Sequence, residues 1–561
     1  MRFSAEAIAA VRFAAFAFAV AALLLSTFGR RYGLVRFAPG GSSFDTLIRP
    51  IFVAIFVVAL LVAMRWEIVG GLIAAFAAAG LVAFAAQQLR TGSAVLVVVA
   101  FAIPALLWFI IDVHALSAKR AAWAVGAAVA LSAVGFLLGQ FAYRSVWGAT
   151  HPESMVEPLP DSAVAWVWSG RVGPNEATVR AKIDRGYSLV ELLVDTDSGF
   201  ADPAVVAHTG GLSPVVSFDI GGLQADTTHH YAVRVDGVVD EVRTGQFRTF
   251  PVGPSSFKVV FGACARVGSN GRVFDAINEQ DPLLYMILGD MHYGDNDVDN
   301  IDDYRDVLDL TLSQPGQAAL YRSRGIAYVW DDHDFGANDA NSASTSRAAA
   351  MASYREYVPS YDLAGAQSSI HQAFTIGRVR FILTDARSAR DDQAKVDDAD
   401  KTMLGLEQKQ WFLSEMAQSS QDHELVVWIN PVPWVADTKV GADNWGGYAT
   451  ERAEIANFIV DRDIDNLVMI SGDAHMVAID DGTNTNFSEA PGPGFPLLHS
   501  AALDRPGSTK GGPYSEGAIA GSGQYGMLEV ADDGVTVSIT LSALRWDGAE
   551  LLTFTFDVAE R

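Results

Sequence analysis

Long apolar runs fill the first 150 positions of the chain and then give way to much shorter ones. Five runs have about the 20-residue length that an α-helix needs to cross the hydrocarbon core of a bilayer. They cover residues 5–28, 47–66, 67–87, 94–113 and 120–142. A cleaved signal peptide would account for the first run alone, and buried helices of a soluble bundle need polar faces that these runs lack. The pattern predicts an N-terminal α-helical transmembrane bundle over residues 1–148.

After a proline-containing linker at 149–161, short strand-like runs alternate with Gly, Asp and Asn turn signals. These runs lie near residues 163–167, 177–183, 189–194, 215–220, 231–235 and 246–250. Six or so short strands within roughly 90 residues predict a small β-sandwich over 162–252. Its last turn and strands, at 222–223, 231 and 245–249, resemble a fibronectin III-like module. A structural role is the simpler interpretation of this part.

From residue 255 to 561 the pattern changes to buried β-type runs that each end in a polar loop. Strands are predicted near 258–262, 283–288, 326–330, 379–383, 424–429 and 466–470. Helices are predicted at 273–280, 302–313, 344–357, 404–418 and 450–461. Buried strands that alternate with helices predict an α/β layered domain, in which catalytic groups lie beyond the carboxyl ends of the strands.

Charge separates the two parts of the chain. Residues 1–150 hold 11 Lys and Arg against 4 Asp and Glu, and because the whole chain carries −25, about −32 remains for the rest. So acidic a part argues against a nucleic-acid-binding surface and suits cation binding in an extracytoplasmic setting. Basic residues flank the apolar runs on both sides, so they do not decide the membrane orientation. The single cysteine, Cys264, forms no internal disulfide.

Five polar clusters follow the predicted strands, in order along the chain. They are Phe261-Gly-Ala-Cys264, Gly289-Asp290-Met-His292-Tyr293-Gly-Asp295, Trp330-Asp331-Asp332-His333-Asp334, Thr384-Asp385-Ala-Arg387 and Ser471-Gly472-Asp473-Ala-His475. One Gly-Asp after a strand is usually an ordinary turn. Five such clusters together predict a site that holds metal ions.

The residue types suit the hydrolysis of phosphate esters. Metal ions neutralise the anionic oxygens of the ester and turn bound water into a hydroxide nucleophile near neutral pH. Asp290 has the position for a bridging carboxylate, and in an extended segment Asp473 and His475 leave from the same face. Thiolate and phenolate donors such as Cys264 and Tyr293 suit oxidised iron, whereas carboxylate and amide oxygens suit calcium.

The order Cys, Gly-Asp-x-x-Tyr, Trp-Asp-Asp-His-Asp, Asp-x-Arg, Gly-Asp-x-His over residues 160–555 resembles the alkaline phosphatase D (PhoD-like) family of calcineurin-like metallophosphatases. The resemblance implies phosphomonoesterase and phosphodiesterase activity with iron (Fe³⁺) and calcium. It places Cys264, Asp290, Tyr293 and His475 at iron. It places Asp290, Asp473, one or both of Asp331 and Asp332, and Asn338 at calcium. His292 and Asp295 depart from the common pattern, so other divalent metals remain open.

Further residues have two interpretations each. His333 is either the general acid that protonates the leaving alkoxide or a residue that orients an aspartate. Arg387 either clamps the substrate phosphate or pairs with Asp385. The acidic run at 295–303 is a solvated face or an additional calcium site. Trp428, Trp434 and Trp445 wall the pocket or, as we favour, belong to the core. The Gly/Pro-rich stretch 491–526 is expected to be a surface loop near the site, with a lid role open.

We therefore expect a phosphoric ester hydrolase, an alkaline phosphatase or phosphodiesterase, anchored as a multi-pass protein in the cell membrane with its catalytic domain extracytoplasmic. Its expected partners are a phosphate-ester substrate and the lipid bilayer. One alternative substrate is a phospholipid or cell-envelope phosphodiester. A non-catalytic module that binds metal or a phosphorylated ligand is a different alternative, which the five intact clusters disfavour.

Overall fold

The computed structural model describes residues 49–63, 66–85, 117–147, 159–184, 186–209, 214–269, 271–365, 368–505 and 507–558. The chain divides into two compact units, Met1–Gly148 and Ala149–Arg561. The linker predicted at 149–161 lies almost entirely outside the described residues.

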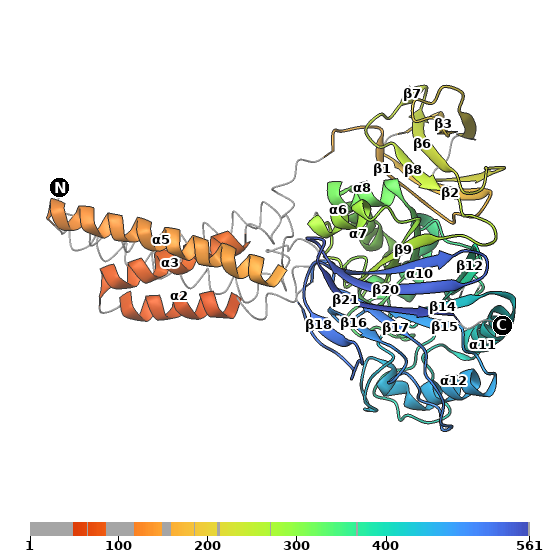
Figure 1. Ribbon diagram of the computed structural model, residues 1–561. Helices are drawn as coiled ribbons and strands as arrows, with labels where there is room; N and C mark the ends of the chain where they lie inside the picture. The colour runs from red at the N-terminus through yellow and green to blue at the C-terminus, as the bar shows by residue number, and fades with distance from the viewer. Residues whose placement is uncertain are drawn as a thin grey trace. The chain divides into compact units, whose positions relative to one another are not determined.

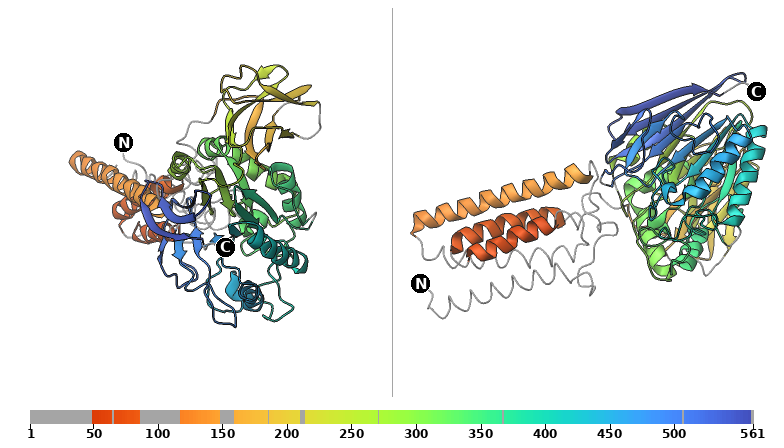
Figure 2. Two further views of the ribbon diagram at one scale, coloured as in Figure 1. Left: turned by 45° about the vertical axis from the view of Figure 1, so that its right-hand side comes forward. Right: turned by 90° about the horizontal axis from the view of Figure 1, so that it is seen from below.

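The first unit contains the helices α2 (Arg49–Ala63), α3 (Glu67–Ala85) and α5 (Ala118–Trp147), which lie side by side (Figure 2). Two glycines of α5 allow α3 to approach closely. A Cβ atom at Gly135 would lie 2.3 Å from the Phe76 carbonyl oxygen, and one at Gly139 would lie 2.6 Å from that of Gly80. The Gly135-x-x-x-Gly139 spacing is the one that brings helix backbones together.

The prediction of several membrane-spanning helices is not supported. Among the described residues one helix, Ala118–Phe141 with a mean hydropathy of 2.0, is long and apolar enough to cross a membrane. Helix α2 is only 15 residues long, and α3 contributes the shorter apolar segment Ile68–Gly80. The predicted runs at 5–28 and 94–113 lie outside the described residues.

The second unit is built on a nine-stranded and a seven-stranded sheet that face each other (Figure 1). The order in the first sheet is β21 (Glu550–Asp557), β20 (Val537–Arg545), β19 (Gln524–Asp532), β9 (Phe257–Gly262), β10 (Leu284–Leu288), β11 (Gly325–Val329), β1 (Val164–Gly170), β2 (Glu176–Ile183) and β5 (Val215–Gly221). The order in the second is β12 (Gln372–Ile376), β13 (Val379–Leu383), β14 (Leu425–Asn430), β15 (Leu467–Ser471), β17 (Leu497–Ser500), β16 (Met476–Asp480) and β18 (Gly517–Ala520).

Helices cover the outer faces of the two sheets, which makes the predicted α/β layers (Figure 1). The nine-stranded sheet carries α6 (Arg272–Glu279), α7 (Ile301–Ser313) and α8 (Pro315–Ser323). The seven-stranded sheet carries α11 (Leu406–Asp422). The remaining helices are α9 (Asp332–Phe335), α10 (Arg347–Tyr357), the 3-10 turn η2 (Trp445–Tyr448) and α12 (Ala449–Asp461).

A third sheet completes the predicted sandwich. It contains β4 (Ala204–Thr209), β3 (Leu189–Asp195), β6 (Thr228–Val235) and β7 (Val238–Val239), with β8 (Gly245–Arg248) also paired to β6. Its partner sheet is formed by β1, β2 and β5, and β1 pairs in parallel with β11. The strands predicted over 162–252 are therefore present, but part of them extends the main sheet. The fibronectin III-like assignment and the domain limits at 162–252 and 255–561 stay predictions.

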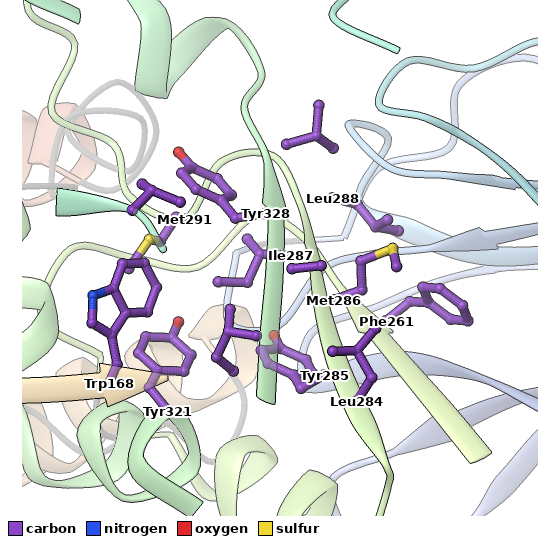
Figure 3. Close-up of a cluster of buried hydrophobic side chains, with 14 of the residues drawn as sticks. Trp168, Phe261, Leu284, Tyr285, Met286, Ile287, Leu288, Met291, Tyr321 and Tyr328 are labelled. Carbon is purple, nitrogen blue, oxygen red and sulfur yellow. The ribbon is translucent and has the colours of Figure 1, made fainter. Parts of the chain in front are cut away.

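Strand β10 shows why the central strands read as continuous apolar runs. All five of its residues are buried, because helices lie on one side and the second sheet on the other. Tyr285 and Ile287 point toward Trp168 and Tyr321, whereas Leu284, Met286 and Leu288 point the opposite way (Figure 3). Trp428, Trp434 and Trp445 are likewise fully buried in the core beside α11 and α12, which confirms their core role.

The stretch 491–526 is not one surface loop, so that prediction is wrong in part. It contains β17, β18 and the start of β19. The strand β17 is only four residues long and lies between proline- and glycine-containing segments, which hides its signal. Strand β4 and helix α8 were also not predicted.

Candidate metal centre

The polar clusters meet at one edge because the strands before them run in parallel. Strand β10 pairs in parallel with β9 and with β11, so Cys264, Asp290 and Asp331 follow three neighbouring carboxyl ends. Gly289, with φ of +97°, allows this convergence, since a Cβ atom there would lie 2.5 Å from the Asp331 Cβ. Asp473 and His475 reach the same place from the end of β15 in the facing sheet.

The four predicted iron ligands lie in contact. The Cys264 Sγ is 3.5 Å from Asp290 Oδ2 and 3.5 Å from the Asp473 carbonyl oxygen, and the Tyr293 hydroxyl is 3.0 Å from His475 Nε2. Burial, and then the charges of Asp290 and Asp473, raise the pKa of the Cys264 thiol well above its usual value. A thiol in this field becomes a thiolate only if a cation compensates the charge.

Two groups of possible metal ligands extend the site. The possible ligand atoms of Asp290, Asp332 and His333 all lie within 4.8 Å of one another, and so do those of Asp332, Asp339 and Asp443. Asp290 Oδ1, Asp331 Oδ2 and Asp332 Oδ1 are buried and have no hydrogen-bond donor. Buried carboxylate oxygens without donors are costly. These oxygens, together with the neighbouring thiol, phenol and imidazole groups, are therefore suited to bind metal cations.

His333 lies at the edge of this cluster. Its Nδ1 contacts a carboxylate oxygen of Asp295, and its ring centroid is 4.0 Å from that of Tyr293. Burial lowers the pKa of His333, but the charges of Asp332 and Asp290 and the hydrogen bond to Asp295 outweigh it and raise the pKa to about 10. The contact with Asp295 leaves Nε2 as the nitrogen that is directed toward other groups.

Arg387 lies inside the cluster and not at its surface. Its side chain is 0% exposed; Nε donates to Asp331 Oδ1 at 2.5 Å, and Nη1 and Nη2 donate to Asp443 at 3.0 and 2.9 Å. Only its backbone N–H donates to Asp385, so the expected pair with Asp385 is not a guanidinium contact. The guanidinium of Arg387 compensates the buried carboxylates of Asp331 and Asp443. No part of it is exposed, so none of its N–H groups faces solvent, where a substrate phosphate would enter.

Residues that are adjacent in the sequence motifs differ in burial and in their contacts with the carboxylates. Asn338 is exposed, whereas the next residue, Asp339, donates its backbone N–H to Asp332 Oδ2 at 2.6 Å and joins the second carboxylate group. His292 is buried beside Asp334, and burial lowers its pKa to about 4. Two residues of the acidic run at 295–303 hold helix ends in place. The Asn300 side chain caps the N-terminus of α7, and the Asp299 carboxylate accepts a hydrogen bond from the Ala349 N–H in α10.

Sequence reasoning missed three partners that come from loops. Asp443 pairs with Arg387 and Arg390, and Lys510 Nζ lies 2.8 Å from Asp473 Oδ1. The Arg505 guanidinium stacks 3.9 Å from the centre of the Tyr293 ring. Only the predicted proximity of residues 491–526 to the site pointed toward Lys510 and Arg505.

Three of the ligands predicted from the sequence have left-handed backbone conformations. The φ angles are +61° at Cys264, +50° at Asp290 and +69° at Asp473. Such conformations are uncommon for residues other than glycine and gather at functional sites.

Comparisons with known proteins relate this chain to phosphatases. Residues 259–502 match the profile of a family described as PhoD-like phosphatase. Alkaline phosphatase D of Bacillus subtilis (strain 168) is 24% identical over 414 residues, which cover 64% of this chain and 69% of that protein. A solved structure described as PhoD aligns with a TM-score of 0.59 at 18% identity and covers 72% of this chain and 92% of its own. The structural likeness shows a shared fold.

Proposed function

We propose that this phosphoric ester hydrolase, whose residues 259–502 are of the PhoD-like phosphatase type, cleaves phosphate esters with metal ions held at the strand ends. The observation that supports the metal site best is the convergence of Asp290, Asp331 and Asp332, each with a buried carboxylate oxygen that lacks a hydrogen-bond donor. Cys264, Asp290, Tyr293 and His475 would hold iron. Calcium would be held by Asp290, by Asp473 and by one or both of Asp331 and Asp332. Asp339 would replace Asn338 in this set, because Asn338 is exposed.

The proposed hydrolysis depends on the positive charge of the metal ions. Bound cations would neutralise the phosphate oxygens and lower the pKa of a water molecule, which supplies the nucleophile. The buried residues of the chain exclude bulk water from this edge of the sheets, which strengthens each charge interaction there. Arg387 holds Asp331 in place and compensates Asp443.

Hydrolysis and metal content test this proposal together. We expect the purified full-length chain to contain iron and calcium by elemental analysis and to hydrolyse p-nitrophenyl phosphate or bis(p-nitrophenyl) phosphate. Removal of the metals by a chelator should abolish turnover, and their return should restore it. A folded chain without bound metal or turnover, even after incubation with iron and calcium, would favour a binding module instead.

We assign the role of general acid to His333. Its high pKa keeps it protonated at neutral pH, and neutralisation of Asp332 and Asp290 would bring that pKa down into the range of an effective proton donor. His333→Gln should reduce hydrolysis of an alkyl phosphate about a hundredfold, because an alkoxide needs a proton to leave. The loss for p-nitrophenyl phosphate should be much smaller, since nitrophenolate leaves without one.

Asp295→Asn should show the same dependence on the leaving group, because Asp295 holds the His333 ring. Equal losses on both substrates would assign His333 a positioning role only.

We further propose that the N-terminal unit anchors the chain in a lipid bilayer, with the catalytic unit on the extracytoplasmic side. The support is the segment Ala118–Phe141, of which only 6% is buried, with exposed Trp123, Leu137 and Phe141. The acidic second unit suits a compartment rich in calcium. The full-length chain should float with membranes in a density gradient, and protease added to intact cells should cleave its C-terminal unit. Recovery in the soluble fraction without detergent would contradict the anchor.

A further inference from the structure

Lys510 differs from the other cations described at the metal centre in its access to solvent. The side chains of Arg387 and Arg390 are 0% exposed and Arg505 is 1% exposed, so all three guanidinium groups are buried. The side chain of Lys510 is 45% exposed, yet its Nζ lies 2.8 Å from Asp473 Oδ1. Unlike these three guanidinium groups, the ammonium of Lys510 can be approached by an anion from solvent.

The segment that carries Lys510 is tied to the site and is not a free lid. The Ser508 N–H donates to the carbonyl oxygen of His475 at 2.9 Å, and the Gly512 N–H donates to that of Val435 at 2.8 Å. Gly511 has a φ of +72°, and a Cβ atom there would lie 2.2 Å from the Val435 oxygen. These contacts hold both sides of Lys510 and direct its ammonium to the carboxylate cluster.

The contact with Asp473 leaves hydrogen-bonding capacity on the ammonium. A lysine ammonium has three N–H donors, and one is used on Asp473 Oδ1. A lysine side chain is charged at neutral pH, so the ammonium can attract an anion. A phosphate oxygen can therefore be bound without breaking the pair with Asp473.

We propose that Lys510 is a specificity-determining residue whose ammonium donates to a terminal phosphate oxygen and selects phosphomonoesters over phosphodiesters. This inference rests on the proposed function, since it concerns the substrate of the same site. A monoester carries close to two negative charges near neutral pH and three terminal oxygens. A diester carries one charge and two such oxygens. An additional cation at the open side of the cluster therefore favours the monoester.

The test compares two esters with the same leaving group in the metal-loaded, full-length chain. Lys510→Met should lower kcat/KM for p-nitrophenyl phosphate about ten- to a hundredfold, mainly through KM, because a charge-assisted hydrogen bond is lost. The change for bis(p-nitrophenyl) phosphate should stay within about threefold, since the diester carries one negative charge fewer for the ammonium to attract. Calorimetry should show that inorganic phosphate binds the variant more weakly by a similar factor. Lys510→Arg should restore most of the preference for the monoester.

Lys395→Met is the matched control. Lys395 Nζ also lies 2.8 Å from an aspartate, Asp391, and its side chain is 39% exposed, but its neighbouring charges lie on its own loop. This variant should keep wild-type values for both esters and for phosphate binding. Equal losses on the two esters in a folded Lys510→Met, or unchanged phosphate binding, would overturn the specificity role while the phosphoesterase function stands. A metal-loaded wild type that cleaves neither ester would instead contradict the proposed function itself.

Discussion

Asp290→Asn is expected to slow phosphate-ester hydrolysis about a thousandfold, which corresponds to about 4 kcal/mol of transition-state stabilisation. Asp290 follows β10 at the meeting point of both predicted ligand sets, in contact with Cys264 and within 4.8 Å of Asp332 and His333. Asparagine keeps the shape of the side chain but lacks the charge that a bridging ligand needs. Rates on an aryl phosphate, together with elemental analysis of the variant, measure the effect.

The fold of this variant should be unchanged or slightly more stable. Burial raises the pKa of Asp290 to about 7, because its charged form is poorly solvated among other carboxylates. Asp297→Asn is the control, since Asp297 is an exposed aspartate of the acidic run at 295–303 and loss of its charge should not change the rate. Full activity in Asp290→Asn would remove the central support for a metal-dependent phosphoesterase.

Arg387→Leu is expected to lower the free energy of unfolding by about 3 to 5 kcal/mol, the cost of leaving a buried charge without its partner. The substitution removes the donors to Asp331 and Asp443 from a position with 0% exposure. Denaturant unfolding of the variant and the wild type measures the difference. Arg545→Leu, which breaks an exposed pair with Asp547, should cost less than about 1 kcal/mol.

The destabilisation should grow as the pH rises. Burial raises the pKa of Asp331 well above its usual value even with Arg387 present, and loss of the guanidinium raises it further. At low pH the carboxyl takes up a proton and needs no partner, whereas at high pH the folded variant must hold an unpaired carboxylate. A cost that is equal to that of Arg545→Leu, or that falls with rising pH, would contradict this account of Arg387.

Much of the catalytic unit could be predicted because its strands are buried on both faces. The run predicted at 283–288 is β10 at Leu284–Leu288, and the helix predicted at 450–461 is α12 at Ala449–Asp461. The polar loops after such strands showed where ligands gather, since parallel strands end at a shared edge. Cys264, Asp290 and Asp473 are thus found in contact, as expected from their positions along the chain.

The remainder depends on contacts that no local pattern encodes. Asp443 lies on an irregular loop and meets Arg387 across a sequence separation of 56 residues. Lys510 belongs to a glycine-rich segment whose path is determined by hydrogen bonds to His475 and Val435. The parallel pairing of β1 with β11 was equally hidden, because alternation predicts a strand but does not name its neighbour.

The left-handed backbone at Asp290 and Asp473 bears on what a glycine there would do. Glycine adopts such φ angles freely, so replacing either aspartate by glycine would relieve strain on the order of 1 kcal/mol. It would also remove a buried charge. Such a variant should stay folded while it loses a candidate metal ligand, so thermal stability alone cannot tell whether a chain altered at these positions still holds its metals.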